Sequence, residues 1–556
     1  MKPQPHDDPK VFDILAEAFI QEGAGTCFAL LGDANMNWAT RLAGKGCRMI
    51  YVRHEHCAVA AAMAFARKTD DVGLATVTCG PGVTQLMTAL PAAVRAKLPV
   101  VIFAGEAPLK SGWYNQAIDQ APFVVATGAR YHALHHVERM PVAIRDAFVE
   151  ARRDRVPVVL GVPFDLQNRV WPGATVLPAP SAMVLPARLP IPPHPDGVAR
   201  AAELVERSQR IVVLAGMGAV LAGAAAACRA LAKTTGGLLI TTLPARGLFH
   251  DDPFCLGISG SFSTELGLEC LADADLVIAV GSSLALHAGG GGQLAPKAEM
   301  LQIDVEPVGV AQGQEVARHH LEADARLGVE ALVAALGERM STWRSDALAE
   351  RIRHAPPDSH HYDPEPGLFD PRAVVAALEA TLPADWELVN SSGHCSGFVA
   401  HMPSRPQHRF LTIREFGAIG NGTSFAMGVA AARPESPVVL FDGDGSLLMH
   451  VQELETMKRH AMKVLIVVIN DGAYGSEVHK MRAEGMSEEG AVFERCDFAA
   501  IARGFGIAGE TVRDLADLPR LVAAFAALNG PAVWDFQVSD KVVTPVIRRS
   551  HAPRRH

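Results

Sequence analysis

The chain has 556 residues, too many for one hydrophobic core, so it should hold two or three domains. Hydrophobic residues make up 49% and charged residues 20%, a balance typical of a globular protein. The formal net charge of −9 counts against a nucleic-acid surface, so we expect no nucleic-acid partner. Nine scattered cysteines without a CxxC pair, and a start without an apolar signal core, predict a cytoplasmic protein with reduced thiols.

Three α/β segments follow one another: residues 1–175, 196–336 and 371–545. In each, short apolar runs alternate with helical patterns, which favours parallel sheets. Proline-containing stretches between them are typical of semi-rigid linkers. The predicted fold class is therefore α/β, with three doubly wound parallel-sheet domains. The main strand candidates are residues 27–31, 74–77, 100–104, 157–162, 211–214, 238–242, 275–280, 300–303, 438–441 and 464–469.

One uncharged run, residues 211–228, is as long as a short membrane span. Gly216 and Gly218 divide it, and its first four residues have a good strand composition. We interpret the run as strand, glycine turn and helix, and we expect no membrane partner.

The first segment carries two motifs. Arg53-His54-Glu55-His56 precedes an alanine-rich helical pattern, and Thr78-Cys79-Gly80-Pro81-Gly82 follows the apolar run at 74–77. On its own, Glu55 is also the kind of acid that is favoured at the start of a solvated helix.

The third segment carries acidic side chains at the ends of two apolar runs. Gly443-Asp444-Gly445-Ser446 follows residues 438–441, and Asn470-Asp471-Gly472 follows residues 464–469. Ligands of open α/β sheets bind at the carboxyl ends of strands, and two carboxylates there suit Mg²⁺. The glycines let backbone approach phosphate oxygens, and the helix beginning at Ser446 offers free N–H groups to an anion. A lone Gly-Asp-Gly can also be an ordinary turn.

Together these motifs resemble those of thiamine-diphosphate-dependent enzymes, most closely the acetolactate-synthase-like branch. The 24 residues from 446 to 469 match the spacer of the family's diphosphate–Mg²⁺ motif. The resemblance implies pyrimidine-binding, central and diphosphate-binding domains in that order, with thiamine diphosphate and Mg²⁺ as cofactors. Glu55 matches the glutamate that bonds the pyrimidine ring and promotes removal of the thiazolium proton.

The resemblance also implies the remaining cofactor contacts. Ile419 would prop the bent cofactor, although it could be an ordinary core residue. Gly417 would offer its carbonyl to the aminopyrimidine. His394 would touch the diphosphate, or serve only in the structure. The metal ligands would be Asp444, Asp471 and the carbonyl of Ala473. The full cofactor-binding set is Glu55, Pro81, His394, Gly417, Ile419, Gly443, Asp444, Gly445, Ser446, Asp471, Ala473 and Tyr474.

Beyond Glu55, three residues are expected to take part in catalysis. Gln116 matches a glutamine that faces the substrate in acetolactate-synthase relatives. Asp33 and Glu477 match acids of pyruvate-decarboxylase-like enzymes, although Asp33 could be a turn or cap residue and Glu477 a surface acid. The paired histidines of those decarboxylases are missing.

The resemblance implies a lyase or carboligase that decarboxylates a 2-oxo acid and transfers the acyl anion to a carbonyl acceptor. The alternatives are a simple 2-oxo acid decarboxylase, a 2-hydroxyacyl-CoA lyase, and a non-catalytic cofactor-binding relative. The flavin-holding stretch of acetolactate synthases is absent, which counts against FAD. In the family the active sites lie between subunits, so we expect a homodimer or homotetramer.

Overall fold

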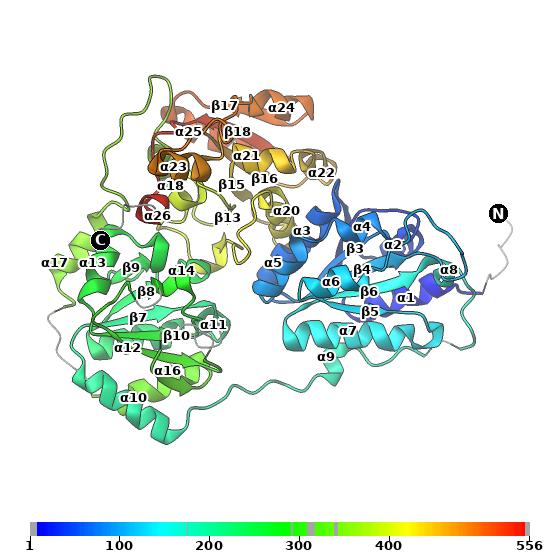
Figure 1. Cartoon of the computed structure of the whole chain (residues 1–556), viewed down its shortest axis with the longest axis horizontal. Coiled ribbons are helices and arrows are strands. Elements are labelled where there is room, and N and C mark those ends of the chain that lie inside the picture. Colours follow the sequence, from blue (N-terminus) through cyan, green and yellow to red (C-terminus); the bar gives the residue numbers. More distant parts are fainter. Residues whose placement is uncertain (1–7, 175, 291–292, 308–316, 338–342, 551–556) are drawn as a thin grey trace.

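The computed structural model describes residues 8–174, 176–290, 293–307, 317–337 and 343–550. It contains three six-stranded parallel sheets, each covered by helices, arranged as three domains in chain order (Figure 1). The predicted α/β class with three doubly wound domains is thereby confirmed.

The first sheet has the strand order β2-β1-β3-β4-β6-β5. Its central strands are buried on both faces, which explains their continuous apolar runs. The elements of this part of the chain are α1 (Val11–Gln21), β1 (Thr26–Ala29), α2 (Met36–Gly44), β2 (Arg48–Tyr51), α3 (Glu55–Thr69), β3 (Gly73–Val77), α4 (Pro81–Thr84), α5 (Ala89–Arg95), β4 (Val100–Glu106), α6 (Ala121–Ala126), β5 (Arg130–Ala133), η1 (Val137–Arg139), α7 (Met140–Asp154), β6 (Pro157–Pro163), α8 (Phe164–Gln167) and α9 (Ser181–Val184).

The central sheet has the order β12-β11-β10-β7-β8-β9. The uncharged run at 211–228 forms a strand, a glycine turn, the short helix α11 and the beginning of α12, in agreement with the expected strand, turn and helix. The elements are α10 (Pro195–Arg207), β7 (Ile211–Ala215), α11 (Met217–Leu221), α12 (Ala225–Thr235), β8 (Leu238–Thr241), η2 (Leu243–Ala245), β9 (Cys255–Ile258), η3 (Gly260–Phe262), α13 (Glu265–Asp273), β10 (Leu276–Val280), α14 (Leu286–Gly289), β11 (Glu299–Asp304), β12 (His319–Glu322), α16 (Ala325–Ala335) and α17 (Asp346–His354). Among the described residues, no helix is long and apolar enough to cross a membrane.

The third sheet has the order β14-β13-β15-β16-β18-β17. Its elements are α18 (Pro371–Thr381), β13 (Glu387–Asn390), α19 (Ser396–Val399), η5 (Gln407–Arg409), β14 (Phe410–Leu411), α20 (Gly422–Ala432), β15 (Val438–Gly443), α21 (Asp444–Met449), α22 (Glu453–Arg459), β16 (Val464–Asn470), α23 (Gly475–Glu484), α24 (Phe498–Gly504), β17 (Ala508–Thr511), η6 (Leu515–Asp517), α25 (Leu518–Ala527), β18 (Ala532–Gln537) and α26 (Pro545–Ser550).

Helices α3 and α20 join the first and third domains. Both are rich in alanine, α20 also contains two glycines, and both are buried almost all round, as expected for helices enclosed in a core. A Cβ atom added at Gly428 of α20 would lie 2.2 Å from the carbonyl oxygen of Ala61 in α3, so the backbones are in close contact. One hydrophobic cluster therefore runs through both domains.

The first linker is fastened to the first domain rather than free. Just before the linker, the N–H of Trp171 donates to the carbonyl of Pro9, and within it Ser181 in α9 donates its N–H to the buried carboxylate of Glu22 at 3.0 Å. Burial raises the pKa of Glu22, and its hydrogen bonds to Ser181 partly offset that effect.

Candidate active site

The candidate site lies at the carboxyl edge of the third sheet, where β13, β15 and β16 are neighbours. The turns after these parallel strands meet there and enclose a pocket. The residues that line it are Ser392, Gly393, His394, Cys395, Ile419, Gly443, Asp444, Gly445, Ser446, Ile469, Asp471, Ala473, Tyr474, Gly475, Ser476 and Glu477. The structure thus brings together nearly all the expected diphosphate and metal residues.

Asp444 and Asp471 are held by backbone N–H groups. Asp444 accepts from the N–H of Gly445 and from that of Gly472, both at 2.8 Å, and Asp471 accepts from Ala473 at 3.2 Å. Burial, reinforced by repulsion from Asp471, raises the pKa of Asp444 to about 8, and burial raises the pKa of Asp471 to about 7. Two buried acids that resist ionisation fit a bound divalent cation, because the cation compensates both charges.

The space beside these carboxylates is kept open by glycines. A Cβ atom at Gly445 would lie 2.7 Å from the ring of Tyr474, and one at Gly475 would lie 2.4 Å from a carboxylate oxygen of Asp471. The helix α21 begins at Asp444, so its first turn, which includes the pocket residues Asp444, Gly445 and Ser446, borders the same space. This cradle and its oxygen ligands fit a diphosphate bridged by a metal.

The loop that contains Gly417 and Ile419 is tied to α21. The N–H of Gly420 donates to Ser446 Oγ at 2.9 Å, and its carbonyl lies 2.7 Å from His450 Nδ1. Ile419 lines the pocket, whereas Gly417 does not, and Gly417 has a φ of +74°. Asp442 is fully buried behind Ser446, and burial raises its pKa to about 7.

His394 is buried at the pocket wall with a structural hydrogen bond. Its Nε2 accepts from the N–H of Thr544 at 3.0 Å, and its Nδ1 lies 3.8 Å from Asp471 Oδ2. Burial lowers its pKa to about 3, so the ring is neutral and does not compensate Asp471. The structure is therefore compatible with both roles expected for His394, contact with the diphosphate and a purely structural one.

Glu477 and Tyr474 lie at the mouth of this pocket. Glu477 is in the first turn of α23 and forms an ion pair with Lys480 at 3.3 Å, with half of its side chain exposed. Tyr474 is 41% exposed. Glu477 is therefore both a pocket residue and partly a surface acid.

Glu55 is the first residue of α3 and lies outside the residues that line the pocket. It is half-buried, and burial raises its pKa. The next residue, His56, is buried and places its Nε2 2.6 Å from Asn421 Oδ1 at the beginning of α20. Within one chain, then, Glu55 lies beside the contact between α3 and α20 and is not among the residues that line the Asp444–Asp471 pocket.

The remaining predicted residues lie at the carboxyl edge of the first sheet. Asp33 follows β1 and is exposed, Pro81 begins α4, and Gln116 lies in the segment after β4. The thiol of Cys79 donates to Gln116 Oε1 at 3.4 Å. Burial raises the pKa of Cys79, and the nearby charge of Asp33 adds to the rise.

Gln120 ends the same segment, residues 113–120, that contains Gln116, but the sequence predicts no role for it. It accepts from the N–H of Gly80 at 2.7 Å and donates to the carbonyl of Gly105 and to the hydroxyl of Tyr131, both at 3.1 Å. A Cβ at Gly80 would lie 2.1 Å from the carbonyl oxygen of Gln116, so this turn requires glycine. Gln120 therefore fixes the turn against which Gln116 rests, a role that only the folded backbone reveals.

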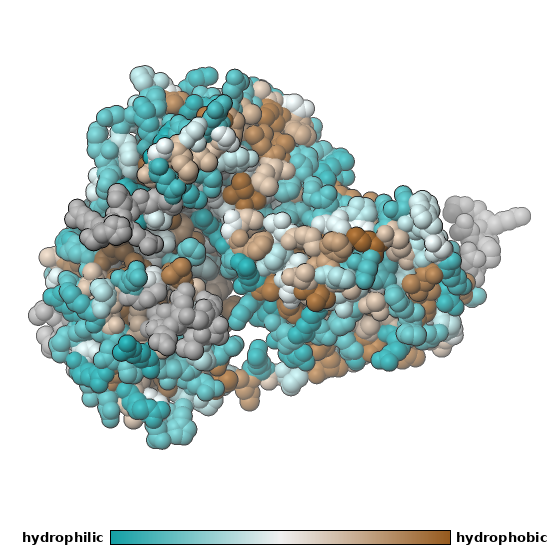
Figure 2. Space-filling view, viewed as in Figure 1, coloured by the Kyte–Doolittle hydropathy of each residue, from teal (hydrophilic) through white to brown (hydrophobic). Residues whose placement is uncertain are grey.

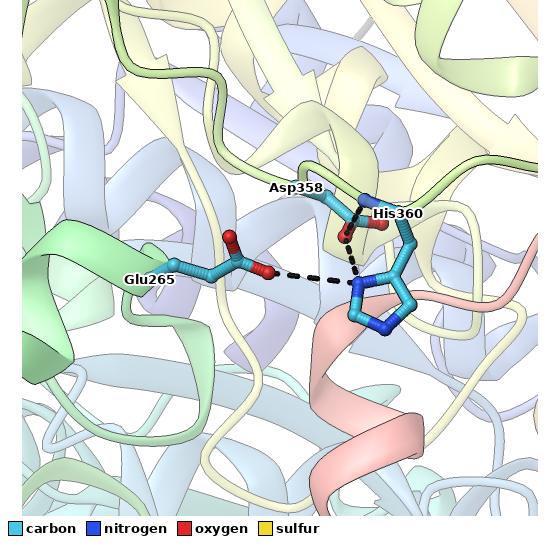
Figure 3. Close-up of side chains that lie close together, drawn as sticks. All are labelled: Glu265, Asp358 and His360. Carbon is cyan, nitrogen blue, oxygen red and sulfur yellow. Dashed lines mark hydrogen bonds and ion pairs between the residues drawn. The ribbon is translucent and has the colours of Figure 1, made fainter.

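Outside this site, Glu265, Asp358 and His360 lie together where the central domain meets the second linker (Figure 3). His360 Nδ1 is 3.4 Å from Asp358 and 3.6 Å from Glu265. Asp358 already pairs with Arg548 of α26 at 2.9 Å and with Arg372 at 3.5 Å. The cluster is thus an ion-pair network that fastens the linker and the C-terminal helix.

The glycine turn after β7, with Gly216 and Gly218, packs directly against another loop of the central domain. A Cβ at Gly216 would lie 2.3 Å from the carbonyl oxygen of Gly281, and one at Gly218 would lie 2.8 Å from the Cα of Gly281. These glycines permit close packing between two loops. Part of the glycine run at 289–292 lies outside the described residues.

Comparison with protein families gives a match for each domain. The models are described as the N-terminal TPP binding domain, the central domain and the C-terminal TPP binding domain of thiamine pyrophosphate enzymes. They match residues 9–123, 198–332 and 391–536, respectively. Thiamine pyrophosphate, or TPP, is another name for thiamine diphosphate.

Relatives of known name are similar along nearly the whole chain. The acetolactate synthase large subunit of Parasynechococcus marenigrum is 28% identical over 88% of this chain and 80% of its own length. The isozyme 2 large subunit of Escherichia coli is 27% identical over 90% of each chain. The probable large subunit of Methanocaldococcus jannaschii is 26% identical over 96% of this chain and 93% of its own.

Three family matches in the order of the three sheets, spanning more than half of the residues, confirm the expected resemblance: the chain belongs to the thiamine pyrophosphate enzymes.

Proposed function

We propose that the protein is a thiamine-diphosphate- and Mg²⁺-dependent enzyme that decarboxylates a 2-oxo acid and transfers the acyl group to a carbonyl acceptor, as in acetolactate synthesis. The observation that carries the proposal is the pair of carboxylates, buried Asp444 and largely buried Asp471, beside a glycine-lined cradle. The names of the relatives support the type of reaction.

When bound, the cofactor would supply the carbanion needed to activate the oxo carbon of the substrate. Asp444, Asp471 and the carbonyl of Ala473 would hold Mg²⁺, and the N–H groups at the beginning of α21 would hold the diphosphate. Ile419 at the pocket wall would support the cofactor, and the carbonyl of Gly417 would accept a hydrogen bond from it.

Glu55 would take the position beside the pyrimidine ring. Its raised pKa suits a carboxyl that shares a proton with a ring nitrogen, because burial favours the protonated form. Gln116 and Asp33 would orient the substrate and move protons from the edge of the first sheet, and Glu477 would act from the edge of the third.

We further propose that the active site is formed between two copies of the chain. Glu55 lies outside the lining of its own chain's pocket, so a second subunit would supply it. This arrangement requires at least a homodimer, or a homotetramer built from two such pairs. A cytoplasmic location and the absence of FAD stay predictions.

Glu477 favours a second candidate function. It is an acid that lines the pocket, so it could protonate the carbanion and release an aldehyde, which makes the enzyme a simple 2-oxo acid decarboxylase. Among the described residues, no contact specifically favours a 2-hydroxyacyl-CoA lyase or a non-catalytic relative.

Turnover of pyruvate by the protein loaded with thiamine diphosphate and Mg²⁺ tests these alternatives. Acetolactate as the product supports acyl transfer, and acetaldehyde supports simple decarboxylation. A panel of larger 2-oxo acids extends the assay to other substrate side chains. Cofactor uptake, measured by calorimetry in the same samples, separates a wrong substrate from a wrong cofactor.

A further inference from the structure

An apolar pocket of about 550 Å³ opens on the first domain, away from the carboxylates of the candidate site. It is formed by α5, α6 and the segment between α4 and α5, and Phe416 of the third domain closes one side. In Figure 1, α5 lies on the flank of the first domain that faces the other two. The volume of the pocket is within the range of pockets that bind small molecules. The residues that line it are Met87, Pro91, Val94, Arg95, Pro122, Phe123, Ala126, Thr127 and Phe416.

Arg95 gives this pocket a positive charge. Its guanidinium lies over the ring of Phe416, 4.7 Å from the ring centroid. The acid beside Phe416, Glu415, already pairs with Arg67 at 3.2 Å. Among the described residues, no acid forms an ion pair with Arg95, so its hydrogen-bond donors are available to a ligand.

The exposed surface of the pocket is otherwise apolar. Phe123 is 40% exposed and Phe416 38%. Hydropathy is mapped over this face of the molecule in Figure 2, where brown atoms lie in patches among teal ones on the first domain. A ligand that fits must therefore offer an apolar body for the wall and an anionic group for the guanidinium.

We propose that this pocket binds a small monocarboxylate with a ring or branched apolar body. The carboxylate pairs with Arg95, and the apolar part lies between α5, α6 and Phe416. Phe416 precedes Gly417, so the bound acid contacts the base of the loop that contains Ile419. The site is separate from the chemistry proposed above and does not depend on it.

Calorimetric titration of the full-length protein with 3-phenylpropionate tests the proposal, and 3-phenylpropan-1-ol serves as the matched ligand without charge. We expect the acid to bind with a Kd at least about tenfold lower than that of the alcohol, because only the acid pairs with the guanidinium. Equal binding of both, or no binding at millimolar concentration, would overturn the proposal.

Three variants test whether the ligand binds in this pocket. Arg95→Met keeps an apolar side chain on Phe416 and should remove the preference for the acid. Ala126→Trp should fill the pocket and abolish binding of both ligands, since Ala126 lines it and is exposed. Val125→Trp is the matched control, because Val125 is 58% exposed on the same helix but does not line the pocket.

Two results with the variants count against the pocket. The first is equal loss of binding in both tryptophan variants. The second is dissociation of an oligomer by Ala126→Trp alone, measured by analytical ultracentrifugation, which would assign the surface to a second copy of the chain.

Discussion

The first and third domains have the same sheet topology but opposite chemistry. Numbered within each domain, both sheets have the strand order 2-1-3-4-6-5. After the third strand, the first domain has the turn of Gly80 and Pro81, whereas the third has Asp444. After the fourth strand, the first has Gln116 and the third has Asp471. The topology therefore provides the location of a site, and the side chains at two turns decide whether it holds a metal.

The helices α3 and α20 likewise have equivalent positions in their domains but begin with different side chains. Each follows the second strand of its sheet, and the two pack together along their length. The helix α3 begins with Glu55, and α20 begins with Gly422 after Asn421. The domain without the metal pair thus supplies the acid proposed for the pyrimidine ring. The five predictions below test this division of roles and the packing of these two helices, from losses of binding and activity to smaller losses of stability.

Replacing Asp444 should have the largest effect on cofactor binding. Asp444→Asn removes one charge of the metal pair, so affinity for thiamine diphosphate in Mg²⁺ should fall on the order of a hundredfold or more. Calorimetry measures the change. Glu510→Gln is the control, since Glu510 is an exposed acid of the same domain. Unchanged affinity in Asp444→Asn would remove this residue from the proposed metal site.

Replacing Glu55 should abolish turnover but keep cofactor binding. In Glu55→Gln, kcat for the 2-oxo acid should fall by about 10²–10⁴-fold, because the amide cannot exchange a proton with the pyrimidine. Stopped-flow or product assays with saturating cofactor give the rate. A variant with normal kcat would contradict the proposed role.

Mixing these two inactive variants tests whether the site lies between chains. A co-expressed mixture of Glu55→Gln and Asp444→Asn should regain about a quarter of wild-type activity, because half of the random dimers contain one intact site. If each site were built within a single chain, the mixture would stay inactive. Each variant expressed alone is the control.

The seam between α3 and α20 should lose stability in acid. Burial lowers the pKa of His56 to about 4, well below its ordinary value, and His54 and His450 lie against its ring. The folded state therefore binds fewer protons than the unfolded state between pH 6.5 and 4. The contribution is present in full above pH 6.5 and is lost as pH falls toward 4, by about 3 kcal/mol in total.

Urea unfolding of the wild type and of His56→Gln over this pH range measures that contribution. The free energy of unfolding should fall more steeply with acidification in the wild type. Parallel pH profiles of the two proteins would show that His56 does not titrate in this way.

A smaller effect is expected from a methyl group at the same seam. In Gly428→Ala the new Cβ would meet the backbone of Ala61 at 2.2 Å, so the free energy of unfolding should fall by about 1–3 kcal/mol. The matched control is Gly504→Ala, also a helical glycine, whose Cβ would have nothing within 4 Å. Equal stability of the two variants would show that the helices separate easily.

Most strands with two neighbours could be predicted from the sequence, but the edge strands and two inner strands, β13 (Glu387–Asn390) and β18 (Ala532–Gln537), could not. Residues 464–469 form a continuous apolar run because β16 is buried on both faces between two neighbours. By contrast, β5 (Arg130–Ala133) and β12 (His319–Glu322) are polar and short, and each has only one neighbour. Their pairing defines them as strands, and a pattern of side chains does not reveal it.

The same distinction applies to the site. Asp444 and Asp471 were predictable because each lies in a motif directly after an apolar run. The role of Gln120 was not predictable, because it depends on the hydrogen bond from the N–H of Gly80, and that N–H reaches Gln120 only in the folded turn. The position of Glu55 outside the pocket also depends on how whole domains pack, about which local sequence carries no information.

The close approach of α3 and α20 has a consequence for the evolution and engineering of the chain. A residue that gains volume on one helix requires a residue that loses volume on the other, since the backbones are separated by no spare layer of side chains. The outer domains can therefore diverge freely at their surfaces while these two helices must change in concert. A chimaera that exchanges the first domain with that of a relative should fold well only if it imports the matching α20 as well.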